Sequence, residues 1–547
     1  MSEAPADPVL FESWKPKIAK YNQELENSMK QEYRLPKDKF PAADEIDMVP
    51  IAKSSGLLTE SELTITETSA VELCAKMAKG ELTATAVLDA FVKRATIAHE
   101  LLNVATGFIL EDGYARAKEL DEYYAKTGKT VGPLHGLPVS IKEHIGFKDK
   151  VCHAGFVSLI ENVTPDDAVT LKVLYKQGAV FYVRTNEPQS LMHPNTTNYI
   201  TGKTVNANNI KLSSGGSSGG EGSLVAFKGS PMGMGTDIGG SIRFPAAFNG
   251  VYGFKPSSKI ISMMGCVAAG EGQESIPCAM GPICSYLDDM TLFMKAYAEA
   301  EPWKLDPSLI PRKWEDVTLD PSKLKVAIMW DDGEVKPHPP IQRGLKFAAE
   351  KLKAAGVELV DWKPVMPGKA FETVGPMYYG DGCKACKDLL AISGEPIHPL
   401  TAYAFSMNHL GDYSAAKLWD LNATKDKIYL ETFDQMNELG VDYILAPTYV
   451  GVAAEQENIH YWNYTSLWNL LDQPCVIIPT GLRQDPAIDL VEDREPWSKW
   501  DAEQKQKYDK DPALFTNGPI ALQVVGRRLH DEHALAAAKI IDDILHG

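Results

Sequence analysis

The chain has 547 residues, of which 44% are hydrophobic and 23% are charged, and its formal net charge is −18. This size and composition are ordinary for a globular enzyme that buries a large core. The negative charge argues against binding to nucleic acid or to an anionic membrane surface.

The first residues contain no basic segment followed by an apolar one, and no run of about 18 apolar residues occurs. We therefore expect a cytoplasmic protein without a secretory signal or a membrane-spanning segment. The cysteines are dispersed along the chain, and we expect them to be reduced thiols. Cys383 and Cys386 form one C-x-x-C pair without a second pair, which does not favour a redox or zinc site.

Residues 1–68 are rich in proline and charge. They predict an N-terminal extension that packs on the main domain, with one helix over 12–29. The catalytic domain is expected over 69–547. Ser69 and Glu72 have the spacing of a capping box, Gly80 is placed to end that helix, and Thr83 can cap the next one.

Short apolar strands and amphipathic helices then alternate, which is typical of an α/β sheet covered on both faces. The segments 301–319 and 485–510 are expected to be loops. Strands are predicted over 104–110, 139–142, 179–184, 325–329, 357–360, 443–446, 475–478 and 520–525, and helices over 114–126, 167–177, 340–355 and 530–545.

Two glycine-rich turns contain serines that such turns would expose. Ser217 lies in the run SSGGSSGG, and Ser241 follows a glycine pair at an expected helix start. Glycine lets backbone N–H groups approach a ligand closely, and a helix N-terminus favours negative charge. We therefore expect backbone amides before this helix to bind an oxyanion, namely those of Ile238, Gly239, Gly240 and Ser241.

Lys142 ends the apolar run over 139–142 and is the candidate base. A lysine with the usual pKa of about 10.4 is under roughly 0.1% neutral at pH 7, but burial lowers this pKa. Ser217 would pass a proton from Ser241 to Lys142, and Ser218 would be a hydrogen-bonding neighbour. These residues suggest a hydrolase that works without a catalytic histidine, although His144 is near enough to influence the pKa of Lys142.

The segment 213–256 resembles the signature of the amidase signature family, in particular its fungal acetamidase-type branch, which is related to fatty acid amide hydrolase. The likeness extends from roughly residue 55 to the C-terminus. It implies a single large α/β/α domain with a mixed central sheet covered by helices on both faces, and no cofactor or metal. It implies that Lys142, Ser217 and Ser241 form the catalytic triad and that the Gly216–Ser217 peptide is cis.

The same resemblance implies supporting roles for Asp237 and Arg243 and a place for Leu191 in the acyl pocket. One departure is Glu143, where many relatives have aspartate after the lysine. Glutamate keeps the charge but moves it by one methylene.

Other interpretations fit less well. A glycine-serine tract is typical of a linker, but here it precedes an expected buried helix. The G-x-S-x-G spacing around Ser217 matches a nucleophile elbow, which needs a strongly apolar strand before it, and residues 206–211 are polar. His530 and His533 fit the solvated start of the last helix better than a metal pair. Candidates to line the acyl pocket are Tyr378, Tyr379, Tyr461, Trp462, Tyr464 and Trp468.

The resulting hypothesis is a serine-dependent amidase that hydrolyses short-to-medium or aryl primary amides to carboxylate and ammonia through an acyl-enzyme. A fatty acid amide or N-acylethanolamine hydrolase is the alternative, because pocket depth cannot be read from sequence. An amidotransferase subunit that acts only inside a tRNA-modifying complex is disfavoured by the negative charge. We expect a small-molecule amide as the partner, no nucleic acid, and a homodimer.

Overall fold

A mixed sheet of eleven strands forms the centre of the structure, a computed structural model that describes residues 7–411 and 414–547. Within these residues the strand order is β1-β3-β2-β6-β8-β7-β12-β13-β11-β9-β10. The strands are β1 (Ala105–Phe108), β2 (Pro138–Lys142), β3 (Val180–Thr185), β6 (Met232–Asp237), β7 (Tyr252–Lys255), β8 (Ala279–Cys284), β9 (Lys325–Met329), β10 (Glu358–Trp362), β11 (Tyr443–Pro447), β12 (Cys475–Arg483) and β13 (Pro519–Val525). A separate hairpin pairs β4 (Thr197–Asn198) with β5 (Gly202–Lys203).

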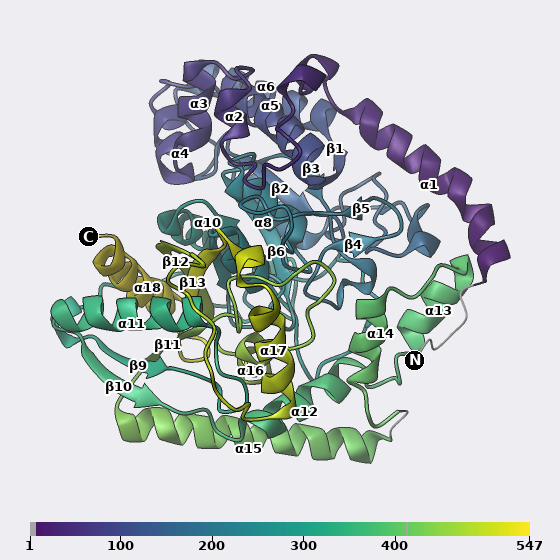
Figure 1. Ribbon diagram of the computed structural model, residues 1–547. Coiled ribbons are helices and arrows are strands. Elements are labelled where there is room, and N and C mark those ends of the chain that lie inside the picture. Colours follow the sequence, from purple (N-terminus) through teal and green to yellow (C-terminus); the bar gives the residue numbers. More distant parts are fainter. Residues whose placement is uncertain (1–6, 412–413) are drawn as a thin grey trace.

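Helices flank this sheet, which confirms the predicted single α/β domain with a mixed central sheet (Figure 1). They are α1 (Pro8–Ser28), α2 (Ile51–Ser54), α3 (Glu60–Glu67), α4 (Ala70–Ala78), α5 (Ala84–Leu102), α6 (Leu110–Thr127), α7 (Val169–Lys176), α8 (Gly219–Ala226), α9 (Arg243–Asn249), α10 (Leu287–Glu299), α11 (Pro339–Ala354), α12 (Pro367–Tyr378), α13 (Lys384–Ser393), α14 (Pro399–Ser406), α15 (Ala415–Leu439), α16 (Asn463–Leu470), α17 (Lys499–Lys510) and α18 (Asp531–His546). None of these described helices is long and apolar enough to cross a lipid bilayer.

The pairing of β2 with β6 builds the edge on which the candidate site lies. These two strands are parallel, with Ser140 opposite Gly233 and Ile141 opposite Met234. Parallel neighbours end at the same edge of a sheet. The last residues of the two strands, Lys142 and Asp237, therefore come to one place in the fold.

The capping residues explain where the early helices begin. Ser69 accepts the N–H of Glu72 at 3.2 Å, and Thr83 caps α5. The side chain of Glu72 pairs with Lys76 instead of returning to Ser69, so the predicted capping box is only half formed. A complete capping box begins α3, where Thr59 is the cap.

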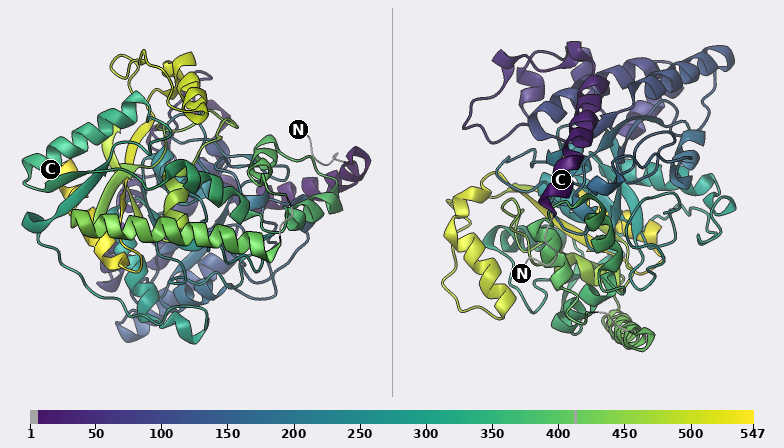
Figure 2. Two further views of the ribbon diagram at one scale, coloured as in Figure 1. Left: turned by 90° about the horizontal axis from the view of Figure 1, so that it is seen from below. Right: turned by 90° about the vertical axis from the view of Figure 1, so that its right-hand side faces the viewer.

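The N-terminal helix α1 lies along the outside of the molecule (Figure 1, Figure 2). It begins before the predicted range of 12–29 because the Asp7 carboxylate accepts two backbone N–H groups of its first turn. Phe11, Trp14 and Ile18 of this helix pack against a small apolar cluster around Val157. Residues 1–6 of the predicted extension lie outside the described residues.

One predicted loop is wrong. The charged segment 485–510 ends in the helix α17, which begins at a Ser498 cap that accepts the N–H of Asp501. Only Asp501, Gln504 and Tyr508 of this helix are buried. A hydrophobic period could not predict it because its buried side is mostly polar, and Asp501 is held by an ion pair with Arg494.

Candidate active site

Lys142 and Ser217 are in direct contact, as the sequence predicted. The Nζ of Lys142 lies 2.6 Å from the Oγ of Ser217. The Gly216–Ser217 peptide is cis, which the resemblance implied. Ser241 lies close by, because its carbonyl accepts the backbone N–H of Ser218 at 3.2 Å. The hydroxyls of Ser217 and Ser241 line the same cavity without a hydrogen bond between them among the described residues.

The glycines of the two turns are required because neighbouring atoms leave no room for a side chain. A Cβ on Gly216 would lie 2.5 Å from the backbone nitrogen of Asn195. Gly240 has a φ of +133°, and a Cβ there would lie 2.4 Å from the ring of Phe244. Side chains at these two positions would push both serines out of place.

Lys142 is fully buried, with an exposed fraction of 0%. Burial lowers the pKa of its amine, while the nearby carboxyl groups of Glu187 and Asp237 act in the opposite direction. The direction agrees with the requirement that a lysine base must be able to lose its proton near neutral pH.

The amine of Lys142 has a second partner that sequence reasoning missed. Its Nζ lies 3.1 Å from the Oγ1 of Thr236, and this hydroxyl lies 2.9 Å from the Nε2 of His144. Ser218 lies beneath Thr236 and makes long contacts of 3.4 and 3.5 Å with its backbone. Thr236 immediately precedes Asp237 in the sequence, but no motif assigned it a contact with the lysine.

Asp237 and Arg243 form a buried ion pair that holds the turn before Ser241. Both side chains have exposed fractions of 0%, and the closest N–O distance is 2.9 Å. Asp237 also accepts the backbone N–H groups of Gly240 at 2.8 Å and Ile242 at 3.1 Å. Burial alone would raise the pKa of Asp237, but the Arg243 guanidinium holds it well below its usual range.

Replacing Asp237 with asparagine should therefore destabilise the fold by about 3–5 kcal/mol, because Arg243 would remain buried without its counter-charge. Urea unfolding measures this loss. Asp442→Asn is the matched control, since Asp442 pairs with Arg527 on the surface, where an ion pair contributes about 0–1 kcal/mol. Equal unfolding midpoints for the two variants would contradict the assigned role of the buried pair.

One of the four backbone amides that were expected to bind an oxyanion is already occupied. The N–H of Gly240 already donates to Asp237. The N–H groups of Ile238, Gly239 and Ser241 have no acceptor among the residues that the structure describes. Three of the four predicted donors are therefore unengaged at the start of the helix.

A cavity of about 330 Å³ lies over the two serines. Leu191, Tyr378 and Tyr379 line it, as does Ile238. A smaller cavity of about 20 Å³ is also lined by Ser241 and contacts Trp462. The other predicted aromatic residues do not line either cavity. They are buried elsewhere in the core, namely Tyr461, Tyr464 and Trp468.

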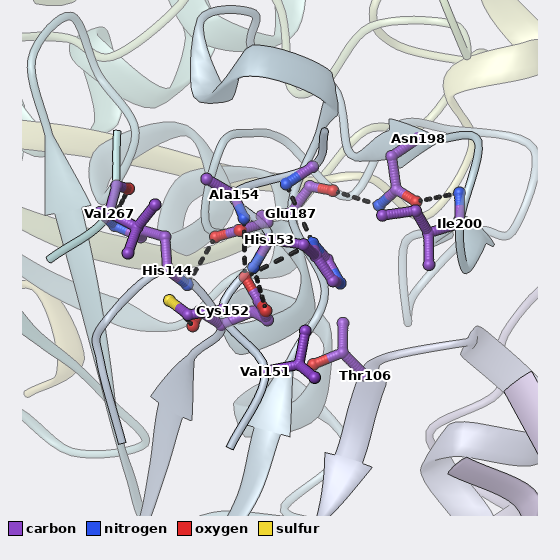
Figure 3. A network of polar contacts seen from close by, with 12 residues as sticks. Thr106, His144, Val151, Cys152, His153, Ala154, Glu187, Asn198, Ile200 and Val267 are labelled. Carbon is purple, nitrogen blue, oxygen red and sulfur yellow. Dashed lines mark hydrogen bonds and ion pairs between the residues drawn. The ribbon is translucent and has the colours of Figure 1, made fainter. Parts of the chain in front are cut away.

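Glu143, the residue after the lysine, forms a buried cluster with His153 and Glu187 whose side chains could hold a cation. Figure 3 labels His153 and Glu187 of this cluster. Glu143 accepts two backbone N–H groups and lies 3.6 Å from the guanidinium of Arg184. The Nδ1 of His153 accepts the N–H of Gly155 at 3.0 Å. Burial, followed by the charge of Glu143, raises the pKa of Glu187 well above its usual range.

The cluster therefore has its charges balanced internally. Arg184 compensates the negative charge of Glu143, and burial together with that charge disfavours a second negative charge on Glu187. The carboxylate of Glu143 and the Nδ1 of His153 already have hydrogen-bond partners, whereas the Oε1 of Glu187 and the Nε2 of His153 have none among the described residues. Because Arg184 already lies beside Glu143, the residues fit an ion-paired support better than a cation site. The extra methylene of Glu143 carries its carboxylate toward the backbone amides of His153 and Ala154.

Comparison with known proteins gives a consistent result. The sequence profile of the family described as Amidase matches residues 86–535. A putative amidase of Schizosaccharomyces pombe is 39% identical over 538 residues, covering 97% of this chain and 99% of its own. The chain belongs to the amidase signature family.

Further similarities of this amidase extend over its whole length. An acetamidase of Emericella nidulans is 37% identical over 547 residues, with 98% of each chain covered. The solved structure of a fatty acid amide hydrolase superposes with a TM-score of 0.95 at 41% identity, covering 99% of this chain and 97% of the other. Family and relatives together identify the protein as an enzyme that hydrolyses amides.

Proposed function

We propose that this amidase hydrolyses primary carboxylic acid amides to carboxylate and ammonia through an acyl-enzyme on Ser241. The contact of 2.6 Å between Lys142 and Ser217 is the observation that carries the proposal. A buried lysine in contact with a serine hydroxyl is an arrangement that moves protons. The second serine, in a turn with unengaged amides, supplies the nucleophile.

In the first half-reaction neutral Lys142 takes the proton of Ser217, which takes the proton of Ser241. The oxygen of Ser241 bonds to the amide carbon, and the negative charge on the carbonyl oxygen is stabilised by the amides of Ile238, Gly239 and Ser241. The C–N bond then breaks, and the proton held by Lys142 returns through Ser217 to the leaving amine. Ammonia departs and an ester remains on Ser241.

In the second half-reaction water attacks this ester. Its proton follows the same path through Ser217 to Lys142, and the returning proton restores the hydroxyl of Ser241 as the acid departs. The amide and one water have become a carboxylate and an ammonium ion. Apart from the amide and this water, each step uses side chains and backbone amides of this chain.

The cavity supports a substrate larger than acetamide. A volume of about 330 Å³ is many times the roughly 10–15 Å³ that a cavity needs to hold one water molecule. Much of the lining is apolar, including Leu191, Ile276 and Leu309. Short-to-medium and aryl amides match this space, and we propose them as the preferred substrates.

A panel of primary amides tests this preference. Each methylene that enters an apolar pocket adds about 0.8 kcal/mol, or about fourfold in kcat/KM. For the four added methylenes, kcat/KM should therefore rise about 250-fold from acetamide to hexanamide, and it should fall again for oleamide. Ile276→Phe, which fills part of the cavity, should move the optimum toward shorter amides.

The likeness to a fatty acid amide hydrolase supports one alternative. If oleamide or an N-acylethanolamine were the best substrate of the panel, the lipid-amide function would replace the proposed one. If the folded chain alone released ammonia from none of these amides, a subunit that needs a partner complex would become the better hypothesis.

A further inference from the structure

Four groups in the site form a hydrogen-bonded chain with only one possible direction. The carbonyl oxygen of Val267 lies 3.1 Å from the Nδ1 of His144. A carbonyl can only accept, so this ring nitrogen carries the proton and donates. The Nε2 of a neutral ring is then an acceptor, and the hydroxyl of Thr236 must donate to it.

The hydroxyl of Thr236 has one proton, and the hydrogen bond to the ring of His144 uses it. Its oxygen can therefore only accept from the amine of Lys142, at 3.1 Å. A neutral amine has two N–H groups and one lone pair. With one N–H directed to Thr236, the lone pair is free to face the hydroxyl of Ser217 at 2.6 Å.

The direction of these hydrogen bonds stays the same over the pH range in which the enzyme works. Burial, followed by the positive charge of Lys142, lowers the pKa of His144 to about 3. The ring therefore stays neutral and its Nε2 stays an acceptor. Charged or titratable groups from several parts of the sequence surround Lys142 and this ring. They are Glu143, Arg184, Glu187, Asp237, Cys266 and Cys278.

We propose that His144 and Thr236 are positioning residues that orient the amine of Lys142 so that its lone pair faces Ser217. This inference rests on the proposed function, in which Lys142 is the base. His144 acts by making Thr236 an acceptor toward the lysine. Without the ring, the hydroxyl of Thr236 could donate to the lysine lone pair and compete with Ser217.

Two substitutions test the two links. Thr236→Val keeps the shape and removes the hydroxyl, and His144→Asn keeps a donor near Val267 but removes the Nε2 acceptor. Each should lower kcat for hexanamide about 10- to 100-fold, as a misdirected catalytic group does, with KM changed less than about threefold. Thr236→Ser, which keeps the hydroxyl, should stay within about threefold of the natural chain.

The pH profile and the double variant separate positioning from a structural role. Thr236→Val removes an acceptor that stabilises the ammonium form of Lys142. His144→Asn frees the Thr236 hydroxyl to donate to the neutral amine. Both changes lower the pKa of Lys142. The acidic limb of kcat against pH should therefore move to lower pH in both variants. Because both residues act through the same series of hydrogen bonds, the kcat of the double variant should be no lower than that of the less active single variant.

The outcomes are distinguishable. Variants that unfold at lower temperature but keep the kcat and pH profile of the natural chain would overturn the inference. Multiplying losses in the double variant would also overturn it, because the two residues would then act separately. If the natural chain itself hydrolysed no amide, the proposed function would fail first.

Discussion

We expect Ser241→Ala to abolish amide hydrolysis while leaving the protein folded. We expect kcat/KM for hexanamide to fall about 10⁴-fold or more, the scale seen when the nucleophile of a serine hydrolase is removed. The side chain of Ser241 makes no hydrogen bond within the described part of the chain, so its loss should cost little stability. Ammonia release and thermal unfolding measure the two effects.

Ser466→Ala is the matched control for this experiment. Ser466 is fully buried in α16, and its hydroxyl has no partner among the described residues. We expect the natural rate from this variant. Comparable activity in Ser241→Ala and Ser466→Ala would remove Ser241 from the mechanism.

Lys142→Met should have the second largest effect. It removes the base, and positioned bases contribute about 10²–10⁴-fold to such rates. We expect a loss of about 10³-fold on amides and a smaller loss on p-nitrophenyl esters, whose leaving group departs without protonation. Assays of both substrates with the same preparation give the ratio.

The pH dependence follows from the direction of the lysine pKa. In the proposed mechanism Lys142 is active when neutral, and burial lowers its pKa from the ordinary lysine value. Activity should therefore rise with pH as the buried amine loses its proton, and it should fall as pH drops below that pKa. Lys142→Met should lose this acidic limb. A variant that kept the natural pH profile would show that another group is the base.

Local sequence patterns predicted the parts of the fold that depend on neighbours along the chain. The strand over 325–329 has the predicted bounds because its apolar run is short and continuous. The turns at Ser217 and Ser241 were recognisable because their glycines allow close backbone contacts. The helix α17 was missed because its buried face is mostly polar.

Contacts across the sheet could not be predicted in the same way. Thr236 and Lys142 are 94 residues apart, and their contact depends on the pairing of β2 with β6. The pairing register is absent from any local pattern. The bond from the Gly240 amide to Asp237 spans only three residues, and sequence reasoning missed it because that amide was assigned to the oxyanion instead.

The cluster of Glu143, His153 and Glu187 could not be predicted from local sequence patterns either. Glu143 was visible in the sequence as a departure from the family pattern, but its partner Arg184 comes from the neighbouring strand β3. Glu187 lies beyond the end of the same strand and shares the buried site. Charge balance in such a cluster is a property of the assembled fold, not of any segment.

Trapping of the acyl-enzyme tests the central claim most directly. The chain would be mixed with excess p-nitrophenyl hexanoate, quenched in acid, digested and analysed by mass spectrometry. We predict a hexanoyl group on the peptide that contains Ser241, and none on that peptide from Ser241→Ala. A hexanoyl group on another residue that lines the cavity, such as Cys266 or Cys278, would contradict the proposed mechanism.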